Sequence, residues 1–232
     1  MSVGFASGTR IRTPRGDVAV DDLRIGDNVV TVSGESRPIM RIEAQTIAQP
    51  GREMAPIRVR ANAFIDNQPG RDLLLSPGHC IVAKVMDEVF LPVSELVNGA
   101  TVARETPGEV TYWRVELARH DVILAEGLKV ESCLAAAADG GPANATERAR
   151  PIVVKGPVID AAQQRLITRA EALGWTRRQD MDLHLLVDGV RCDGDIDGDL
   201  ARFLFPAAAE NVVIASIYAE ALKAEGATIS EK

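Results

Sequence analysis

Two short blocks near the start of the chain bring together side chains that could act on a peptide bond. The first runs from Gly4 to Thr9, and the second, Leu-Leu-Leu-Ser-Pro-Gly-His, ends with Ser76 and His79. A hydroxyl can hydrogen-bond an amide, and an imidazole can carry a proton near neutral pH. Taken alone, a histidine after Pro-Gly also fits an ordinary turn. The residues of these two blocks alone therefore leave a chemical role and an ordinary turn both open.

A third block, from Glu116 to Gly127, contains the pair His120 and Asp121. A histidine beside a carboxylate can relay a proton, but the same pair could form the polar tip of a hairpin. The sequence alone leaves both readings open.

The remaining candidate ligands and nucleophiles show no metal or disulfide spacing, so we expect neither a metal nor another cofactor. Cys80, Cys133 and Cys192 are far apart and form no CxxC pair, and the chain's third histidine, His184, lies in an apolar run. The stretch from Asp193 to Asp199 alternates acidic residues as a calcium loop does, but it lacks the closing glutamate. A solvated acidic turn is the favoured interpretation.

The elements that must position these residues read as short strands. Apolar runs of strand length, each ended by Gly, Pro, Asn or Asp, follow one another from residue 17 to residue 125. Without long amphipathic helices between them, this pattern predicts an all-β domain over residues 1–134.

The second half of the chain divides differently. Residues 135–150 are small and polar and include Gly-Gly-Pro, which predicts a linker. We expect residues 151–218 to form a smaller β-rich extension with one helix over 158–173, stopped by Gly174. Asp188-Gly189 between two apolar runs predicts a hairpin. Residues 219–232 form an Ala-, Glu- and Lys-rich tail.

Composition excludes several classes of function. The net charge is −7, aromatic residues make up 4%, and no segment concentrates Lys or Arg, so we expect no nucleic-acid partner. No apolar run reaches the length of a membrane span, and no cleavable signal is visible at the start. The cellular location stays open, since export without a cleaved signal also fits.

The order and spacing of the three blocks resemble the Hint family of hedgehog and intein autoprocessing domains. The resemblance is to the bacterial subgroup that opens Cys-Phe-x-x-Gly-Thr and carries Leu-Ser-Pro-x-His. It implies an N-terminal cysteine that attacks the preceding carbonyl, with Ser76 orienting the scissile amide and His79 protonating its nitrogen. It further implies that His120 assists proton transfer and that Asp121 is its acidic neighbour.

This chain departs from the family at the nucleophile, because position 4 is a glycine. We therefore expect a self-processing domain that is inactive as written. Cys80 is a poor substitute, since on a strand it would face the side opposite His79. No His-Asn pair occurs, so full splicing is excluded and N-terminal cleavage or ligation is the expected ancestral reaction. Gly4 fits either an engineered replacement or a natural loss.

The expected partners follow from that reaction. They are the chain's own N-terminal flanking polypeptide and an external nucleophile (water, a thiol or an amine) that resolves the thioester. The alternative hypothesis is a non-catalytic β-rich binding or structural module.

Overall fold

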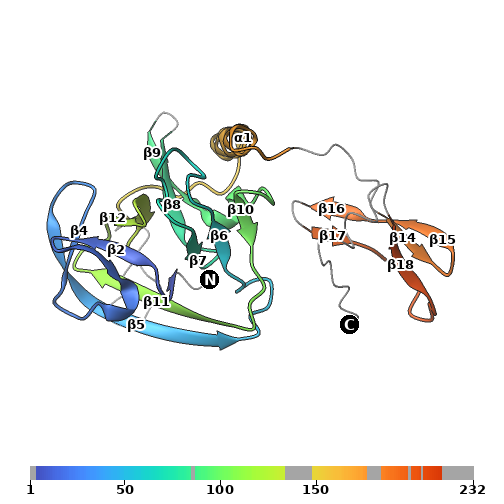
Figure 1. Ribbon diagram of the computed structural model, residues 1–232, viewed down its shortest axis with the longest axis horizontal. Helices are drawn as coiled ribbons and strands as arrows, with labels where there is room; N and C mark the ends of the chain where they lie inside the picture. Colours follow the sequence, from blue (N-terminus) through green and yellow to red (C-terminus); the bar gives the residue numbers. More distant parts are fainter. Residues whose placement is uncertain are drawn as a thin grey trace. The chain divides into compact units, whose positions relative to one another are not determined.

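The chain folds into two compact units, residues 1–175 and residues 176–232. The computed structural model describes residues 4–84, 87–133, 148–176, 184–197, 200–204 and 206–215. Strands dominate both units, as Figure 1 shows, so the predicted mainly β class is confirmed. Among the described residues, no helix has the length and apolar character needed to cross a membrane.

The first unit is built on two antiparallel sheets. The larger contains, in spatial order, β10 (Val102–Arg104), β6 (Ile57–Val59), β7 (Leu73–Leu75), β1 (Phe5–Ala6), β11 (Glu109–Leu117), β5 (Ser36–Ala48) and β4 (Asn28–Val30). The smaller contains β3 (Gly16–Ala19), β2 (Arg10–Thr13), β12 (Val122–Ala125), β13 (Leu128–Glu131), β8 (Cys80–Lys84) and β9 (Glu88–Pro92). Two 3-10 turns, η1 (Val20–Asp22) and η2 (Val93–Leu96), complete the β part of the unit.

The longest pairing joins β5 to β11, which run side by side in Figure 1 from Glu109 opposite Ala48 to Leu117 opposite Ile39. Along β11 buried Val110 and Tyr112 alternate with partly exposed neighbours, the period that a sheet with one covered face requires. The far half of β5 is mostly exposed and polar, so the sequence pattern predicts only its first half. Pairing with β11 extends it.

One continuous apolar cluster fills the space between the elements of the first unit. It draws on both sheets through fully buried residues such as Phe5, Ile11, Leu75 and Ile81. Burial of this kind is the main favourable term in folding. The cluster fixes β1 and β7 beside each other, which sets the geometry of the site.

The α-helix in the described part of the chain, α1 (Pro157–Ala172), belongs to the first unit, and this differs from our expectation. Helix α1 places Ile159, Ala162 and Leu166 in the apolar cluster of the β domain. The Gln163 amide donates to the Glu95 carbonyl over 2.7 Å. We expected the helix, over residues 158–173, to fold with the C-terminal extension. The apolar stripe of the helix predicts that one face is buried, but it does not indicate which surface covers that face.

The end of the expected linker also packs on the first unit. Residues 148–153 return along strand β9, where Phe90 N–H donates to Pro151 O over 2.8 Å and Val153 N–H donates to Phe90 O over 2.9 Å. Residues 135–147 of the linker lie outside the described part of the chain. Because residues 148–150 are bonded to the β domain, they are part of it rather than a spacer.

The second unit contains short antiparallel strands. Its sheet is formed by β14 (His184–Val187), β15 (Val190–Asp193) and β18 (Val212–Ala215), and β16 (Asp195–Asp197) pairs with β17 (Leu200–Arg202). The predicted Asp188-Gly189 turn is confirmed, since both residues have positive φ, 49° and 81°. Residues 216–218 and the tail over 219–232 lie outside the described residues.

The acidic stretch, Asp193 to Asp199, falls partly in these strands. Residues 195–197 form β16, while residues 198 and 199 lie outside the described part. Within the described residues no three His, Cys, Asp or Glu side chains gather as a metal site.

Candidate functional site

The first two blocks meet around the backbone of Gly4. Gly4 precedes β1, Ser76 follows β7, and the two strands pair with Phe5 opposite Leu75. The Gly4 N–H donates to Ser76 Oγ over 2.9 Å, and the Ser76 N–H donates to Gly4 O over 3.0 Å. Both residues are buried. The serine hydroxyl therefore contacts the nitrogen of the Val3–Gly4 peptide bond.

Gly4 lies so close to β11 that a side chain would be crowded. A Cβ at this position would approach the Tyr112 Cβ to 3.0 Å and the Trp113 carbonyl oxygen to 3.2 Å. Both neighbours are part of a paired strand, so neither can turn aside as the end of a flexible side chain could. Any residue larger than glycine requires β1 and β11 to separate by a few tenths of an ångström.

His79 is held rigidly in the same place. Its N–H donates to Ser76 O over 3.0 Å, which closes the Ser-Pro-Gly-His turn, and its ring lies 4.4 Å from the Phe5 ring centroid. The side chain is fully buried, and Nε2 lies 3.1 Å from Glu131 O. A carbonyl oxygen only accepts hydrogen bonds, so Nε2 carries the proton.

The second ring nitrogen of His79 is left available for chemistry. Nδ1 is buried and makes no hydrogen bond within the part of the chain that the structure describes. Burial lowers the pKa of His79, although the negative charge of Glu131 and the backbone of Gly4 and Glu131 act in the opposite direction. The neutral ring therefore presents a lone pair that can take a proton and return it.

His120 is also buried and is joined to His79 through Glu131. Its Nδ1 accepts the Ala149 N–H over 3.0 Å, so Nε2 carries the proton and lies 3.2 Å from Glu131 Oε2. The ring is edge-on to Phe90, with centroids 5.4 Å apart. His120 therefore has no direct hydrogen bond to Ser76 or Gly4.

Glu131 was not among the residues that the sequence singled out. Its carboxylate is 2% exposed and accepts hydrogen bonds from the Cys80 N–H, His120 and Arg148. Burial alone would raise its pKa, but the bonds from His120 and Cys80 and the charge of His79 hold the pKa of this carboxyl below its ordinary value. Glu131 ends the short strand Leu-Lys-Val-Glu, and nothing in that sequence distinguishes it from the chain's other acidic residues.

Asp121 points to a different partner. Its carboxylate accepts Arg37 Nε over 2.9 Å and the Val122 N–H over 2.8 Å, while its own N–H donates to Ser132 Oγ over 3.0 Å. These bonds tie the start of β12 to the region of β5. They place Asp121 in an ion pair with Arg37, and within the described residues its carboxylate has no hydrogen bond to His79 or His120.

Cys80 does not offer a replacement thiol. Its side chain packs with Phe90 and Val122 in a cluster separate from the one that contains Phe5. Burial raises the pKa of the Cys80 thiol strongly, and burial raises that of Cys133 to about 12. Both stay protonated and unreactive near neutral pH.

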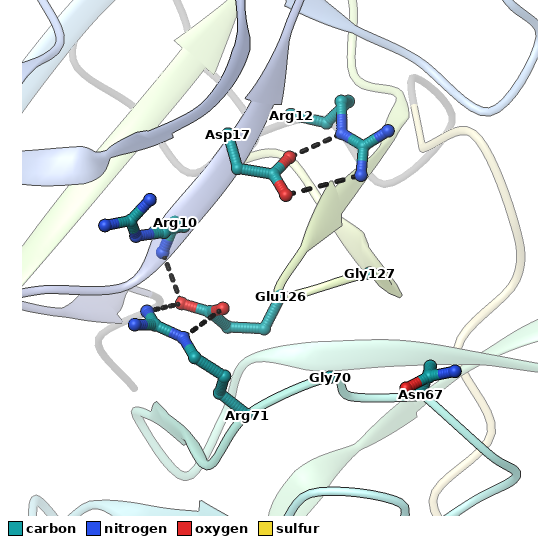
Figure 2. Close-up of a pocket in the computed structure, with 8 residues that line it drawn as sticks. All are labelled: Arg10, Arg12, Asp17, Asn67, Gly70, Arg71, Glu126 and Gly127. Carbon is teal, nitrogen blue, oxygen red and sulfur yellow. Dashed lines mark hydrogen bonds and ion pairs between the residues drawn. The ribbon is translucent and has the colours of Figure 1, made fainter.

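A second buried carboxylate, Glu126, lines an open pocket of about 520 Å³ (Figure 2). Glu126 Oε1 accepts the Arg10 N–H over 2.7 Å, and both carboxylate oxygens pair with Arg71, over 2.7 and 3.0 Å. Arg12 and Asp17 form a second ion pair across the pocket. Its eight lining residues are Arg10, Arg12, Asp17, Asn67, Gly70, Arg71, Glu126 and Gly127.

Two antiparallel sheets of one β domain bring Ser76 against the Gly4 nitrogen, and His79 ends the turn that begins at Ser76. A family model described as "Hint domain" matches residues 3–137. The chain belongs to the Hint domain family.

Solved structures that this chain resembles include two inteins and one intein-like domain. They are the MchDnaB-1 intein (N145AA; 16% identity, TM-score 0.40, 56% of this chain and 99% of that one), a DnaB intein from Synechocystis sp. PCC 6803 (11%, 0.41, 57% and 99%) and a bacterial intein-like domain from Clostridium thermocellum (14%, 0.40, 57% and 99%). A comparison with curated proteins gives no match.

Proposed function

We propose that the first unit is a self-processing domain for N–S acyl shift and N-terminal cleavage, whose proton-transfer site is assembled but whose nucleophile is missing. The observation that carries this proposal is the hydrogen bond from Gly4 N–H to Ser76 Oγ, with the buried, unpaired Nδ1 of His79 at the end of the same Ser-Pro-Gly-His turn. The Ser76 hydroxyl contacts the nitrogen of the Val3–Gly4 bond, and the Gly4 backbone acts on the pKa of the His79 ring. Gly4 supplies no atom that could attack the carbonyl.

The reaction that a thiol at position 4 would undergo has a defined balance. The sulfur adds to the Val3 carbonyl carbon, and the carbon–nitrogen bond to residue 4 breaks, which leaves a thioester and a free amine. The thiol proton passes to His79 Nδ1 and from there to the departing nitrogen. The Ser76 hydroxyl holds that nitrogen in place. An external thiol, amine or water then releases the N-terminal polypeptide.

The experiment restores the missing atom. A soluble passenger is fused ahead of Met1 in the full chain carrying Gly4→Cys, and the purified fusion is incubated with and without dithiothreitol. We expect thiol-dependent release of the passenger, which His79→Ala abolishes. The matched control is Gly4→Ala, which introduces the same Cβ crowding against Tyr112 without a thiol.

The alternative, a non-catalytic binding or structural module, is supported by a separate observation. Position 4 packs against β11 with a 3.0 Å approach that suits glycine and resists any side chain. A domain that no longer catalyses a reaction would keep its β core and could pack β1 this closely against β11. A folded Gly4→Cys fusion that stays intact would favour this alternative.

A further inference from the structure

Glu131 occupies the centre of the buried polar cluster and connects groups that come from three parts of the chain. Its carboxylate contacts the backbone of Cys80 at the start of β8, His120 before β12 and Arg148 beyond β13. Its main-chain oxygen accepts His79 Nε2 over 3.1 Å. Residue 131 thus contacts both histidines, one through its backbone and the other through its side chain.

These contacts determine where the imidazole protons lie. The Glu131 carbonyl requires a proton on His79 Nε2, which leaves Nδ1 with a lone pair and, among the described residues, without a hydrogen bond. The Ala149 N–H requires a lone pair on His120 Nδ1, which directs the His120 Nε2 proton to the Glu131 carboxylate. Both tautomers are therefore fixed by neighbours that cannot exchange roles.

We propose that Glu131 is a positioning residue of the acyl-shift site, whose backbone orients His79 and whose buried carboxylate stabilises the imidazolium that His79 becomes while it carries a proton. The catalytic meaning of this proposal rests on the proposed function. Its electrostatic content concerns the chain as it stands, with Gly4 in place.

The charges around His79 support a specific dependence on Glu131. Burial opposes protonation of His79, the Glu131 charge favours it, and His120 opposes it through like charge. Arg148 contacts Glu131 Oε2, the oxygen that also faces His120, over 3.3 Å. Its positive charge therefore competes with the histidines for the negative charge of Glu131. Cys80 contributes its backbone N–H, and its thiol stays neutral because burial raises its pKa.

Two of these groups lie beyond the residues that match the family model. The match ends at residue 137, whereas Arg148 and Ala149 follow it and contact Glu131 and His120. The segment that follows the family's domain thus completes the environment of the site. We therefore expect changes at Arg148 to act on His79 through Glu131.

The direct test is an NMR titration of the His79 ring in the native, Gly4-containing chain. Glu131→Gln removes the charge and keeps a side chain of nearly the same shape, so we expect the pKa of His79 to fall by about one unit or more. Arg148→Gln removes the competing cation, so the pKa of His79 should rise. Opposite signs from the two variants cannot come from general loosening of the fold.

The matched control is Glu126→Gln. Glu126 is also buried, accepts a backbone N–H and pairs with an arginine, but among the described residues it is not hydrogen-bonded to a histidine. We expect this variant to leave the His79 titration unchanged. If Glu131→Gln shifts His79 no more than Glu126→Gln, or if Arg148→Gln shifts it in the same direction as Glu131→Gln, the inference is wrong. Should Glu131→Gln not fold, the Arg148→Gln and Glu126→Gln titrations decide the question.

A second arm separates this inference from the proposed function. In the Gly4→Cys passenger fusion, Glu131→Gln should slow release at least about tenfold and move its pH profile, with partial recovery in Glu131→Asp. A shifted His79 titration without any passenger release would uphold the role of Glu131 and refute the proposed function. Release with an unshifted titration would do the reverse.

Discussion

Two buried glutamates on one hairpin make similar contacts with a backbone N–H and an arginine, but their other partners differ. Glu126 lies in the turn between β12 and β13, and Glu131 ends β13. Each is at most 9% exposed, accepts one backbone N–H and pairs with an arginine. The remaining partners differ. Within the described part of the chain Glu126 has no hydrogen bond to a histidine, whereas Glu131 is bonded to His79 through its carbonyl and to His120 through its carboxylate.

The two carboxylates also differ in how strongly water screens their charges. At Glu126 the arginine partner is 57% exposed and the pocket is open, so water screens the pair (Figure 2). At Glu131 the neighbouring histidines are buried, so charge acts over the short distances of the site with little screening. We infer that the first glutamate joins two loops and that the second controls protons.

The largest expected effect separates the two carboxylates by stability. Glu131→Ala leaves the Cys80 N–H, the His120 Nε2–H and Arg148 without their acceptor, so we expect a loss of about 3–5 kcal/mol in the free energy of unfolding. Glu126→Ala should cost about 1–2 kcal/mol, because water can replace part of its bonds. Urea unfolding of both variants measures the difference. Equal losses would break the comparison.

Ser76→Ala tests the other end of the site. The Gly4 N–H would remain buried without an acceptor, and we expect a loss of about 2 kcal/mol. Ser76→Thr keeps the hydroxyl and serves as the matched control, with a smaller expected loss. If the two variants were equally stable, the hydrogen bond to the Gly4 nitrogen would contribute nothing to the fold.

The pH dependence of stability should differ between the two regions, because the pocket around Glu126 contains no histidine. Burial lowers the pKa of His79 below its ordinary value of about 6.5, so the unfolded chain binds a proton there before the folded chain does. Stability should therefore fall as the pH drops below about 6.5. We expect His79→Gln to remove about 1–2 kcal/mol of that fall between pH 7.5 and pH 5.

Glu131 acts in a lower pH window. Its folded pKa is depressed, so its contribution is present above about pH 4.5 and is lost as the pH falls further through the folded value. The two windows separate the two groups in one series of unfolding curves. A His79→Gln variant whose stability falls as steeply as that of the parent between pH 7.5 and pH 5 would contradict the assignment.

The smallest expected effects concern the arginine partners. Arg148→Ala leaves a buried carboxylate with less positive charge nearby and should cost about 1 kcal/mol. Arg71→Ala removes a more exposed partner and should change the free energy of unfolding by less than about 0.5 kcal/mol, even less at high salt. Unfolding in low and high salt measures both. A larger loss for Arg71 would reverse the comparison.

Sequence patterns predicted the parts of this structure that depend on local order. Ser76 and His79 belong to one turn, and the apolar residues before Ser76 predict the strand β7. Because β7 pairs with β1, Ser76 comes to lie against Gly4. The Asp188-Gly189 hairpin was predictable because two residues with positive φ determine it. The mainly β class followed from the period of the apolar residues.

What the sequence could not predict depends on contacts between distant segments. The apolar stripe on α1 predicts a buried face but not the surface that covers it. The sequence therefore assigns the helix to the C-terminal extension, whereas it packs on the first unit. Glu131 reads as one acidic residue among many until β8 and β13 pair and enclose it. Asp121 sits beside His120 in the sequence, yet its carboxylate faces Arg37 because successive residues point in different directions.

The measurement that tests the central claim most directly is the mass of the product released from a passenger fused to the full chain carrying Gly4→Cys. In the presence of a small thiol, we expect a passenger that ends at Val3 as a thioester with that thiol, and no such product from Gly4→Ala or from the parent chain. A folded Gly4→Cys fusion that stays intact, or a product of the same mass from Gly4→Ala, would contradict the account.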